Sequence, residues 1–108
     1  MQHEHTLYKV KHQLQGHFGK ALEQLLVFGS VARNSATNAS DIDILIVLND
    51  EVMPLDWQLE KTLIDLLYPI ELEDDVAFDM KMMGKHDLYE RHRNMPFVEH
   101  ILKEGVTI

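Results

Sequence analysis

The stretch FGSVARNSATNASDIDILIVL, residues 28–48, contains the features around which the rest of the chain is organised. It predicts the end of one strand, a turn at Gly29 and Ser30, a short loop and a second strand that starts near Asp41. Asp41 and Asp43 are two residues apart, and side chains two apart on a strand point to the same face. The stretch therefore predicts two carboxylates side by side at the start of a buried strand.

These carboxylates and the neighbouring turn together indicate a type of chemistry. Two like charges repel each other and are costly to desolvate, so the pair needs a positive partner. Carboxylate oxygens are ligands that suit a hard divalent cation such as Mg²⁺. At the turn, Gly29 has no side chain in the way, so backbone N–H groups can approach a phosphate closely. A metal-binding carboxylate pair beside a phosphate-binding turn is typical of phosphoryl or nucleotidyl transfer.

Composition limits the class of protein. The chain has 108 residues and reads as a single domain over 1–108. Its formal net charge of -8 argues against non-specific binding to nucleic acid and fits a metal-dependent site or a basic partner, although plain solubility is the simpler explanation. It has no cysteine, which excludes disulfides and thiolate metal sites. No stretch resembles a signal peptide or a membrane span, so we expect a cytoplasmic location and no membrane partner.

Hydrophobic periodicity predicts the elements around this stretch. The residue spacing gives a helix from about Thr6 to Phe18, a helix that Pro54 opens and Pro69 ends, and a final helix over Pro96–Lys103. A weak helix is expected over Asp87–His92. Buried strands are expected over 25–28, 42–48 and 76–82, and a short helix from Ser30 to Arg33.

A third carboxylate comes from the strand expected over 76–82. Asp79 is the only acidic residue amid the apolar side chains of that strand, and an unpaired buried charge is unfavourable. A metal shared with Asp41 and Asp43 would supply the missing partner. Asp75 is the alternative, but it belongs to the acidic run over 71–75, which reads more simply as a solvated turn or edge.

Two further residues have two interpretations each. Arg33 lies one turn into the short helix and could bind a phosphate as a bidentate donor, or could be a surface cation paired with an acidic side chain. Trp57 lies off the stripe of leucines that the second helix is expected to bury. It could cover the edge of that helix or contact a partner, and the sequence does not choose between these.

The central motif resembles a known family. Gly29-Ser30, then ten residues, then Asp41-Ile42-Asp43 is similar to the signature of the DNA polymerase β-type nucleotidyltransferases. The short chain and the string GSVARNSATNASDIDILIV resemble the minimal nucleotidyltransferases of bacteria and archaea, and the likeness extends to the ending EHILKEGVTI. Ser40 matches the family pattern, whereas Asn34 stands where Gly is usual. The order of elements alone suggests an α/β sheet with a parallel β–α–β unit. The resemblance implies instead a polymerase β-like α+β fold, a small mixed β-sheet flanked by helices.

The resemblance also implies an activity and a set of roles. It implies metal-dependent transfer of a nucleoside monophosphate, by default AMP from ATP, with two Mg²⁺ ions as cofactors. Gly29, Ser30, Arg33 and Ser40 would bind the nucleotide. The three carboxylates Asp41, Asp43 and Asp79 would bind the metals, and Asp79 would also take the proton from the acceptor hydroxyl.

The acceptor is implied less directly, and alternatives stay open. The chain is too short to carry a second domain for a large acceptor. The resemblance implies a helical HEPN or substrate-binding partner encoded nearby, with a tyrosine of a HEPN toxin as the acceptor, which would make this chain an antitoxin. One alternative is transfer to a small molecule held by a separate helical subunit. Another is a binding module without catalysis. An oligomer is compatible with all three.

Overall fold

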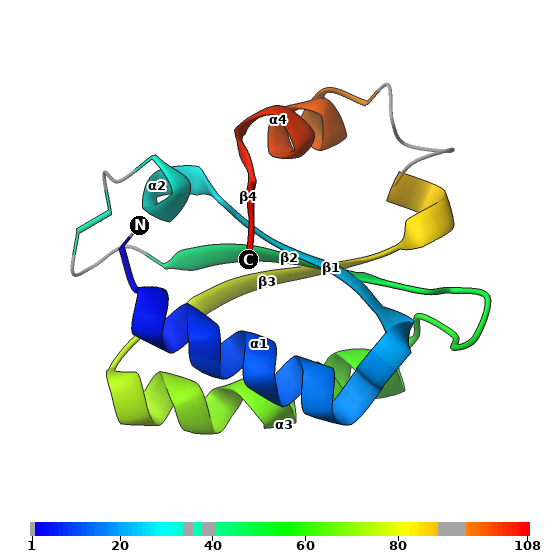
Figure 1. The fold of residues 1–108 in the computed structure, drawn as a ribbon, viewed down its shortest axis with the longest axis horizontal. Helices are drawn as coiled ribbons and strands as arrows, with labels where there is room; N and C mark the ends of the chain where they lie inside the picture. Colours follow the sequence, from blue (N-terminus) through cyan, green and yellow to red (C-terminus); the bar gives the residue numbers. More distant parts are fainter. Residues whose placement is uncertain (1, 34–35, 38–40, 89–94) are drawn as a thin grey trace.

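The structure is a computed structural model that describes residues 2–33, 36–37, 41–88 and 95–108. Helix α1 (Glu4–Phe18) leads through a short 3₁₀ turn (Gly19–Ala21) into strand β1 (Leu22–Phe28) and the one-turn helix α2 (Gly29–Ala32). The chain continues as β2 (Ile42–Leu48), the long helix α3 (Trp57–Asp74), β3 (Phe78–Gly84), α4 (Pro96–Glu104) and the two-residue strand β4 (Val106–Thr107) (Figure 1).

The four strands form one mixed sheet in the order β3-β2-β1-β4. Strands β2 and β3 are parallel and are joined by α3, so the expected parallel β–α–β unit is present. Strand β1 runs antiparallel to β2, and β4 runs antiparallel to β1. The connection from β1 to β2 begins with the one-turn helix α2. The mixed sheet flanked by helices that the resemblance implied is confirmed.

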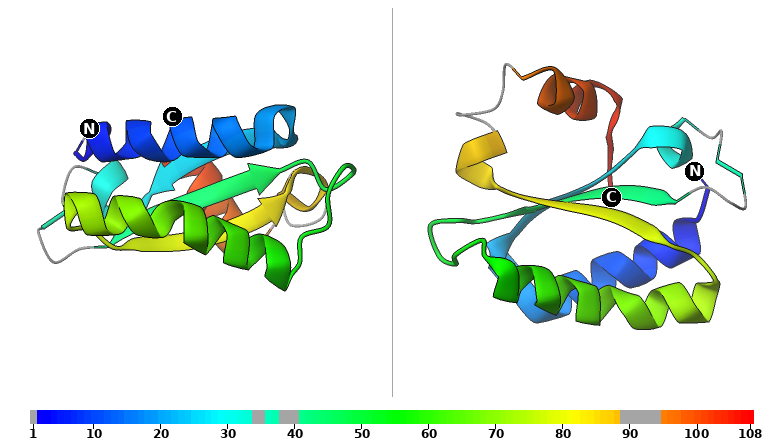
Figure 2. Two further views of the ribbon diagram at one scale, coloured as in Figure 1. Left: turned by 90° about the horizontal axis from the view of Figure 1, so that it is seen from below. Right: turned by 180° about the vertical axis from the view of Figure 1, so that it is seen from behind.

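Helices cover both faces of this sheet. Helices α1 and α3 lie together against one face, and α4 lies against the other (Figures 1 and 2). Alternate residues of β2 serve the two layers: Ile44 and Ile46 belong to the core under α1 and α3, whereas Leu45 and Val47 belong to the core under α4. All four side chains are fully buried. This two-sided burial explains why the sequence of β2 is a continuous apolar run rather than an alternating one.

Helix α3 differs from its prediction at both ends. Pro54 lies in the preceding loop, and the helix begins at Trp57 after Asp56, whose Oδ1 accepts a 3.0 Å hydrogen bond from the Leu59 N–H. A carboxylate at this position satisfies an N–H group that has no partner within the helix. Pro69 lies inside the helix instead of ending it. Buried side chains before and after Pro69, Leu67 and Ile70, hold both segments to the sheet, and this packing offsets the hydrogen bond lost at proline.

The other differences are smaller. Helix α1 starts at Glu4, β1 starts at Leu22 and β3 spans Phe78–Gly84, so each boundary moves by two or three residues. The acidic run over 71–75, expected as a turn or edge, is mostly the last turn of α3. Strand β4 was not predicted. The weak helix expected over Asp87–His92 falls mostly outside the described residues. In the part of the chain that the structure describes, no helix is both long enough and apolar enough to cross a membrane.

Candidate active site

The sheet brings two of the predicted carboxylates together. Asp43 is the second residue of β2 and Asp79 the second residue of β3, and the two are partners in the parallel register. Their side chains therefore leave the same face of the sheet, the face that also carries α4. The two carboxyl groups are close enough for Asp79 to raise the pKa of Asp43. Residues distant in sequence thus meet because parallel strands joined by a helix start at the same edge of the sheet.

The Gly29 turn adjoins this pair. Strand β1 ends at Phe28, which is the antiparallel partner of Asp43, so Gly29 follows directly beside the carboxylates. Gly29 has a φ of 68°, in the left-handed region that favours glycine. A Cβ built on Gly29 would overlap Oδ2 of Asp43 and lie 3.0 Å from its Cγ. The absent side chain is therefore what allows the turn to approach Asp43. Ser30 follows in α2 and is half-buried.

Asp43 is the carboxyl of the site whose pKa is shifted. Partial burial raises the pKa of its carboxyl above the ordinary value of 3.8, and the neighbouring Asp79 carboxylate raises it further. Lys81 opposes this effect and lowers the pKa of Asp43. The Lys81 ammonium lies 3.2 Å from Oδ1 of Asp79 and 5.9 Å from the centre of the Phe97 ring on α4.

Sequence reasoning did not single out Lys81. Its signal was available, because Lys81 stands two residues after Asp79 and must share its face of β3. Asp79 itself is less buried than expected. Its side chain is 48% exposed because β3 is an edge strand, so the expectation of a buried, unpaired charge is wrong. The partner of Asp79 within the chain is Lys81.

Asp41 stands immediately before β2 and is exposed. Its negative charge adds to the rise in the pKa of Asp43, which indicates that the three carboxylates share one electrostatic environment. Among the residues that the structure describes, no three acidic or histidine side chains lie close enough together to bind one metal ion. The chemical type of these side chains nevertheless suits Mg²⁺, because carboxylate oxygens are ligands that this ion prefers. A three-carboxylate metal site stays a prediction that requires Asp41 to turn toward the pair.

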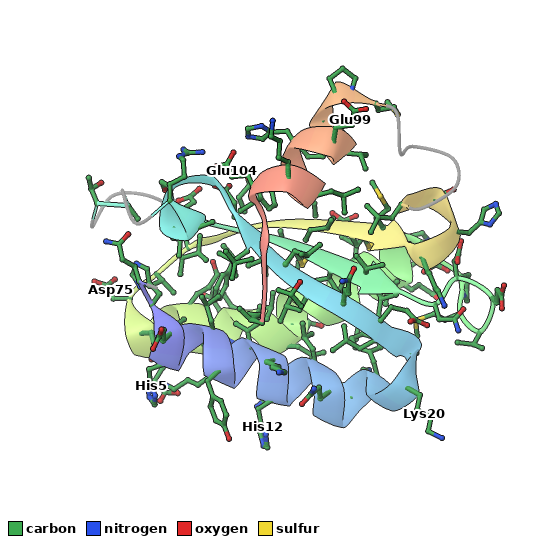
Figure 3. The ribbon with its side chains drawn as sticks, turned by 45° about the horizontal axis from the view of Figure 1, so that its top comes forward. His5, His12, Lys20, Asp75, Glu99 and Glu104 are labelled. Carbon is green, nitrogen blue, oxygen red and sulfur yellow. The ribbon has the colours of Figure 1, made fainter. Side chains whose placement is uncertain are left out.

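Arg33 is engaged with an acidic residue. It directly follows α2, and its guanidinium forms an ion pair with the Glu104 carboxylate of α4. Oε2 of the same carboxylate lies 2.6 Å from Nε2 of His100 (Glu104 is labelled in Figure 3). This ion pair is the surface pairing that the sequence left as the alternative for Arg33. To contact a phosphate, the Arg33 guanidinium would have to break its ion pair with Glu104 or bind both groups at once.

The remaining candidates lie apart from the pair or outside the described residues. Asp75 is the residue that follows the last turn of α3, with a φ of 54°, and Figure 3 places it near the start of α1. The register thus brings Asp79, and not Asp75, beside Asp43. Ser40 and Asn34 fall outside the residues that the structure describes.

Comparison with known proteins agrees with this geometry. The family model described as "Polymerase beta, Nucleotidyltransferase" matches residues 8–108. Solved structures of similar fold include a toxin–antitoxin with AMP-PNP, at 20% identity and a TM-score of 0.61, covering 93% of this chain and 69% of that one. A mutant of the toxin–antitoxin MntA-HpeT aligns at 18% identity and a TM-score of 0.58, with the same coverage.

A protein of Sulfolobus solfataricus described as a nucleotidyltransferase aligns at 16% identity and a TM-score of 0.54, covering 95% of this chain and 76% of that one. At these identities the structural likeness establishes the fold, and the family model establishes the family. No protein of curated function matches the chain by sequence. The match over nearly the whole chain, together with a glycine turn set against paired strand carboxylates, places this chain in the polymerase beta nucleotidyltransferase family.

Proposed function

We propose that this protein transfers AMP from ATP, in a Mg²⁺-dependent reaction, to a tyrosine hydroxyl of a cognate toxin and so acts as an antitoxin. The observation that carries the proposal is the meeting of Asp43, Asp79 and the Gly29 turn at one end of the sheet. These are the parts that a nucleotidyl transfer needs: a close approach for phosphates, and oxygen ligands for the cations that accompany them.

The proposal gives each residue a role that is compatible with its position. The turn at Gly29 and Ser30 would bind the β and γ phosphates through backbone N–H groups. Asp41, Asp43 and Asp79 would hold two Mg²⁺ ions, which supply positive charge to the triphosphate and to the leaving pyrophosphate. Asp79, half exposed on the edge strand, is accessible to an incoming hydroxyl. It would take the hydroxyl proton while the oxygen bonds to the α-phosphorus and the bond to pyrophosphate breaks.

Two similarities support the antitoxin part of the proposal. Two of the similar structures are described as toxin–antitoxin structures, one of them with AMP-PNP, an ATP analogue. The other carries glutamates in place of two aspartates two positions apart, which is the spacing of Asp41 and Asp43 here.

A label-transfer assay tests the reaction. The purified protein is incubated with Mg²⁺, the product of the adjacent gene, and ATP labelled either at the α or at the γ phosphate. We expect label on the partner from α-labelled ATP alone, since nucleotidyl transfer retains the α phosphate. Label from γ-labelled ATP would mean phosphoryl transfer and would overturn the proposal. Label on a small molecule would favour the alternative acceptor, and absence of any transfer would favour a binding module.

Matched variants assign the residues. Asp43→Asn should reduce transfer to background, and Asp79→Asn should reduce it by about 10²–10⁴-fold if Asp79 accepts the proton. Asp65→Asn, an exposed residue of α3 on the other layer, is the control that should keep full activity. Replacement of each partner tyrosine by phenylalanine locates the acceptor. Full transfer by Asp43→Asn would contradict the mechanism.

A further inference from the structure

Lys81 places an ammonium group against the carboxylate pair, and the proposed reaction does not yet use it. Its Nζ lies 3.2 Å from Oδ1 of Asp79, and its positive charge also acts on Asp43. Asp79 and Lys81 are two residues apart on β3, so both side chains leave the sheet face that carries α4. The position of the ammonium therefore follows from the strand itself.

An aromatic ring of α4 lies on the other side of this ammonium. The centre of the Phe97 ring is 5.9 Å from Lys81 Nζ, a distance at which a cation is attracted to an aromatic face. The same ring meets the Phe28 ring edge to face, with the ring centres 6.4 Å apart. Phe28 is in turn the strand partner of Asp43. The two rings thus lie close to the carboxylates and keep the ammonium at the candidate site.

The ion pair between Lys81 and Asp79 is of a kind that opens easily. The two side chains are 40% and 48% exposed, and exposed pairs contribute little to stability because water competes for both charges. The flexible stem of a lysine also allows its ammonium to move without any movement of the strand. A more highly charged partner for either group can therefore separate the pair.

We propose that Lys81 is an exchangeable counter-ion, which neutralises Asp79 in the free protein and moves to the phosphates when a nucleotide binds with its divalent cations. This inference rests on the proposed transfer reaction. Lys81 would give up Asp79 because a doubly charged cation is attracted more strongly to the carboxylate and repels the ammonium. The displaced ammonium would find a new partner in the triphosphate, to which lysine binds as a point charge.

The position of Lys81 complements that of the Gly29 turn. The turn follows β1, on one side of Asp43, whereas Lys81 belongs to β3, on the other side. Two strand spacings separate β1 from β3, about 10 Å in all. A phosphate chain that begins at the turn and crosses the two carboxylates would therefore end near Lys81, and the two would bind opposite ends of it.

Removal of the charge should change two affinities in opposite directions. Lys81→Met keeps an apolar stem and removes the ammonium. Without nucleotide, it should bind a divalent cation about 3–10-fold more tightly than the wild type, because no ammonium competes for Asp79. With saturating Mg²⁺, it should bind an ATP analogue about 3–10-fold less tightly, because one phosphate ligand is missing. A residue that only supports the fold would not produce this pair of opposite changes.

Both affinities can be measured on the whole chain without any turnover. Mn²⁺ takes the same oxygen ligands as Mg²⁺, and the paramagnetic resonance signal of the free ion gives its dissociation constant. Calorimetry with an ATP analogue that carries a carbon bridge between the α and β phosphates gives the second constant. Circular dichroism checks that each variant is folded.

Two further variants serve as controls. Lys85→Met removes the same charge directly after β3, at the end of the strand away from Asp79, where Lys85 lies 3.8 Å from Glu23. It should leave both affinities unchanged. Lys81→Arg retains the charge and should keep both within about threefold of the wild type. Changes in Lys81→Arg as large as those in Lys81→Met would contradict a role of charge.

The outcomes separate this inference from the reaction on which it rests. Unchanged Mn²⁺ affinity in Lys81→Met, with binding that Asp43→Asn abolishes, would overturn the role of Lys81 and leave the proposed reaction intact. Weaker Mn²⁺ binding in Lys81→Met would overturn it too, since the ammonium would then support the site and not compete for it. Failure of the wild type to bind Mn²⁺, or binding that Asp43→Asn does not affect, would overturn the proposed reaction and the inference together.

Discussion

Asp43 touches both chemical parts of the candidate site. It lies beside Asp79 on the neighbouring strand, and its carboxylate occupies the space that a side chain at Gly29 would need. The ordinary preference of a carboxylate is to ionise in water, and here partial burial and a like charge both oppose ionisation. Such a residue is unfavourable for the fold by itself and is typical of functional sites. Two predictions belong to this scale.

The first concerns the turn. Gly29→Ala places a methyl group against Asp43 and forces alanine into a left-handed conformation. We expect it to lower the free energy of unfolding by about 1–2 kcal/mol and to abolish transfer. Gly16→Ala is the control, because Gly16 lies inside α1 with nothing within 4 Å of an added Cβ. That variant should gain up to about 1 kcal/mol. Equal effects in urea unfolding would contradict the close approach at Gly29.

The second concerns the charge of Asp43. Its pKa is raised in the folded protein, so its contribution to stability is present below about pH 3.8 and is lost as the pH rises through the folded value. In the presence of a chelator, Asp43→Asn should therefore be more stable than the wild type at pH 7, by a few tenths to about 1 kcal/mol. The difference should shrink as the pH falls. Thermal unfolding between pH 3 and pH 8 measures it, and a variant less stable than the wild type at pH 7 would refute the repulsion.

At the scale of elements, ion pairs and a hydrogen bond connect the start of α1 to the end of α3. The Lys9 ammonium lies 2.6 Å from Oδ1 of Asp74 and 2.7 Å from Oε1 of Glu73, and the Thr6 hydroxyl donates to Oδ2 of Asp74 at 2.6 Å. These acidic residues belong to the run that sequence alone assigns to solvent. The contact ties the last turn of α3, beyond Pro69, to the first turns of α1 and so supports the end of α3 from which the chain enters β3.

Removal of this contact should have the opposite pH dependence to Asp43. The hydrogen bonds from Lys9 and Thr6 hold the pKa of Asp74 below its usual value of 3.8. Its contribution to stability is therefore present above pH 3.8 and is lost as the pH falls through the lower folded pKa. Asp74→Asn should reduce the unfolding temperature at pH 7 and converge on the wild type in acid. A constant difference at every pH would show that the charge of Asp74 is not the cause.

At the scale of the whole molecule, the carboxylates add to a chain that is already acidic. The net charge of -8 and the negative charges of Asp41 and Asp79 that act on Asp43 favour association with cations over anions. Triphosphate is itself an anion, so cations must accompany it to this end. Lys81 is the basic side chain observed beside the carboxylates, and it is paired with Asp79.

Divalent metal should consequently stabilise the folded protein. At a Mg²⁺ concentration ten times the dissociation constant, linkage gives about 1.4 kcal/mol. Differential scanning calorimetry should detect a higher unfolding temperature with MgCl₂ than with NaCl of equal ionic strength, and a chelator should reverse it. Asp43→Asn should lose the increment, whereas Asp65→Asn should retain it. An increment that persists in Asp43→Asn would place the metal elsewhere on the protein.

Local signals in the sequence were sufficient for much of this description. The strand predicted over 42–48 is β2 with the same bounds. It could be predicted because a strand covered on both faces has a continuous run of apolar residues. The Gly29-Ser30 turn and the spacing to Asp41 and Asp43 predicted the family correctly, since that motif depends on neighbours in the chain. The same reading failed at Pro69, where a local rule predicted a helix end and packing on the sheet overrode it.

By itself, then, the sequence determined most of the elements and the family, which rest on patterns of residues close along the chain. Only the tertiary structure decided which later carboxylate meets Asp43, because strand register brings Asp79 there and leaves Asp75 at the end of α3. It also decided that Glu104 pairs with Arg33 and that β4 completes the sheet. These contacts join residues that no local rule relates, and they form when the packing of the core fixes the strands against one another.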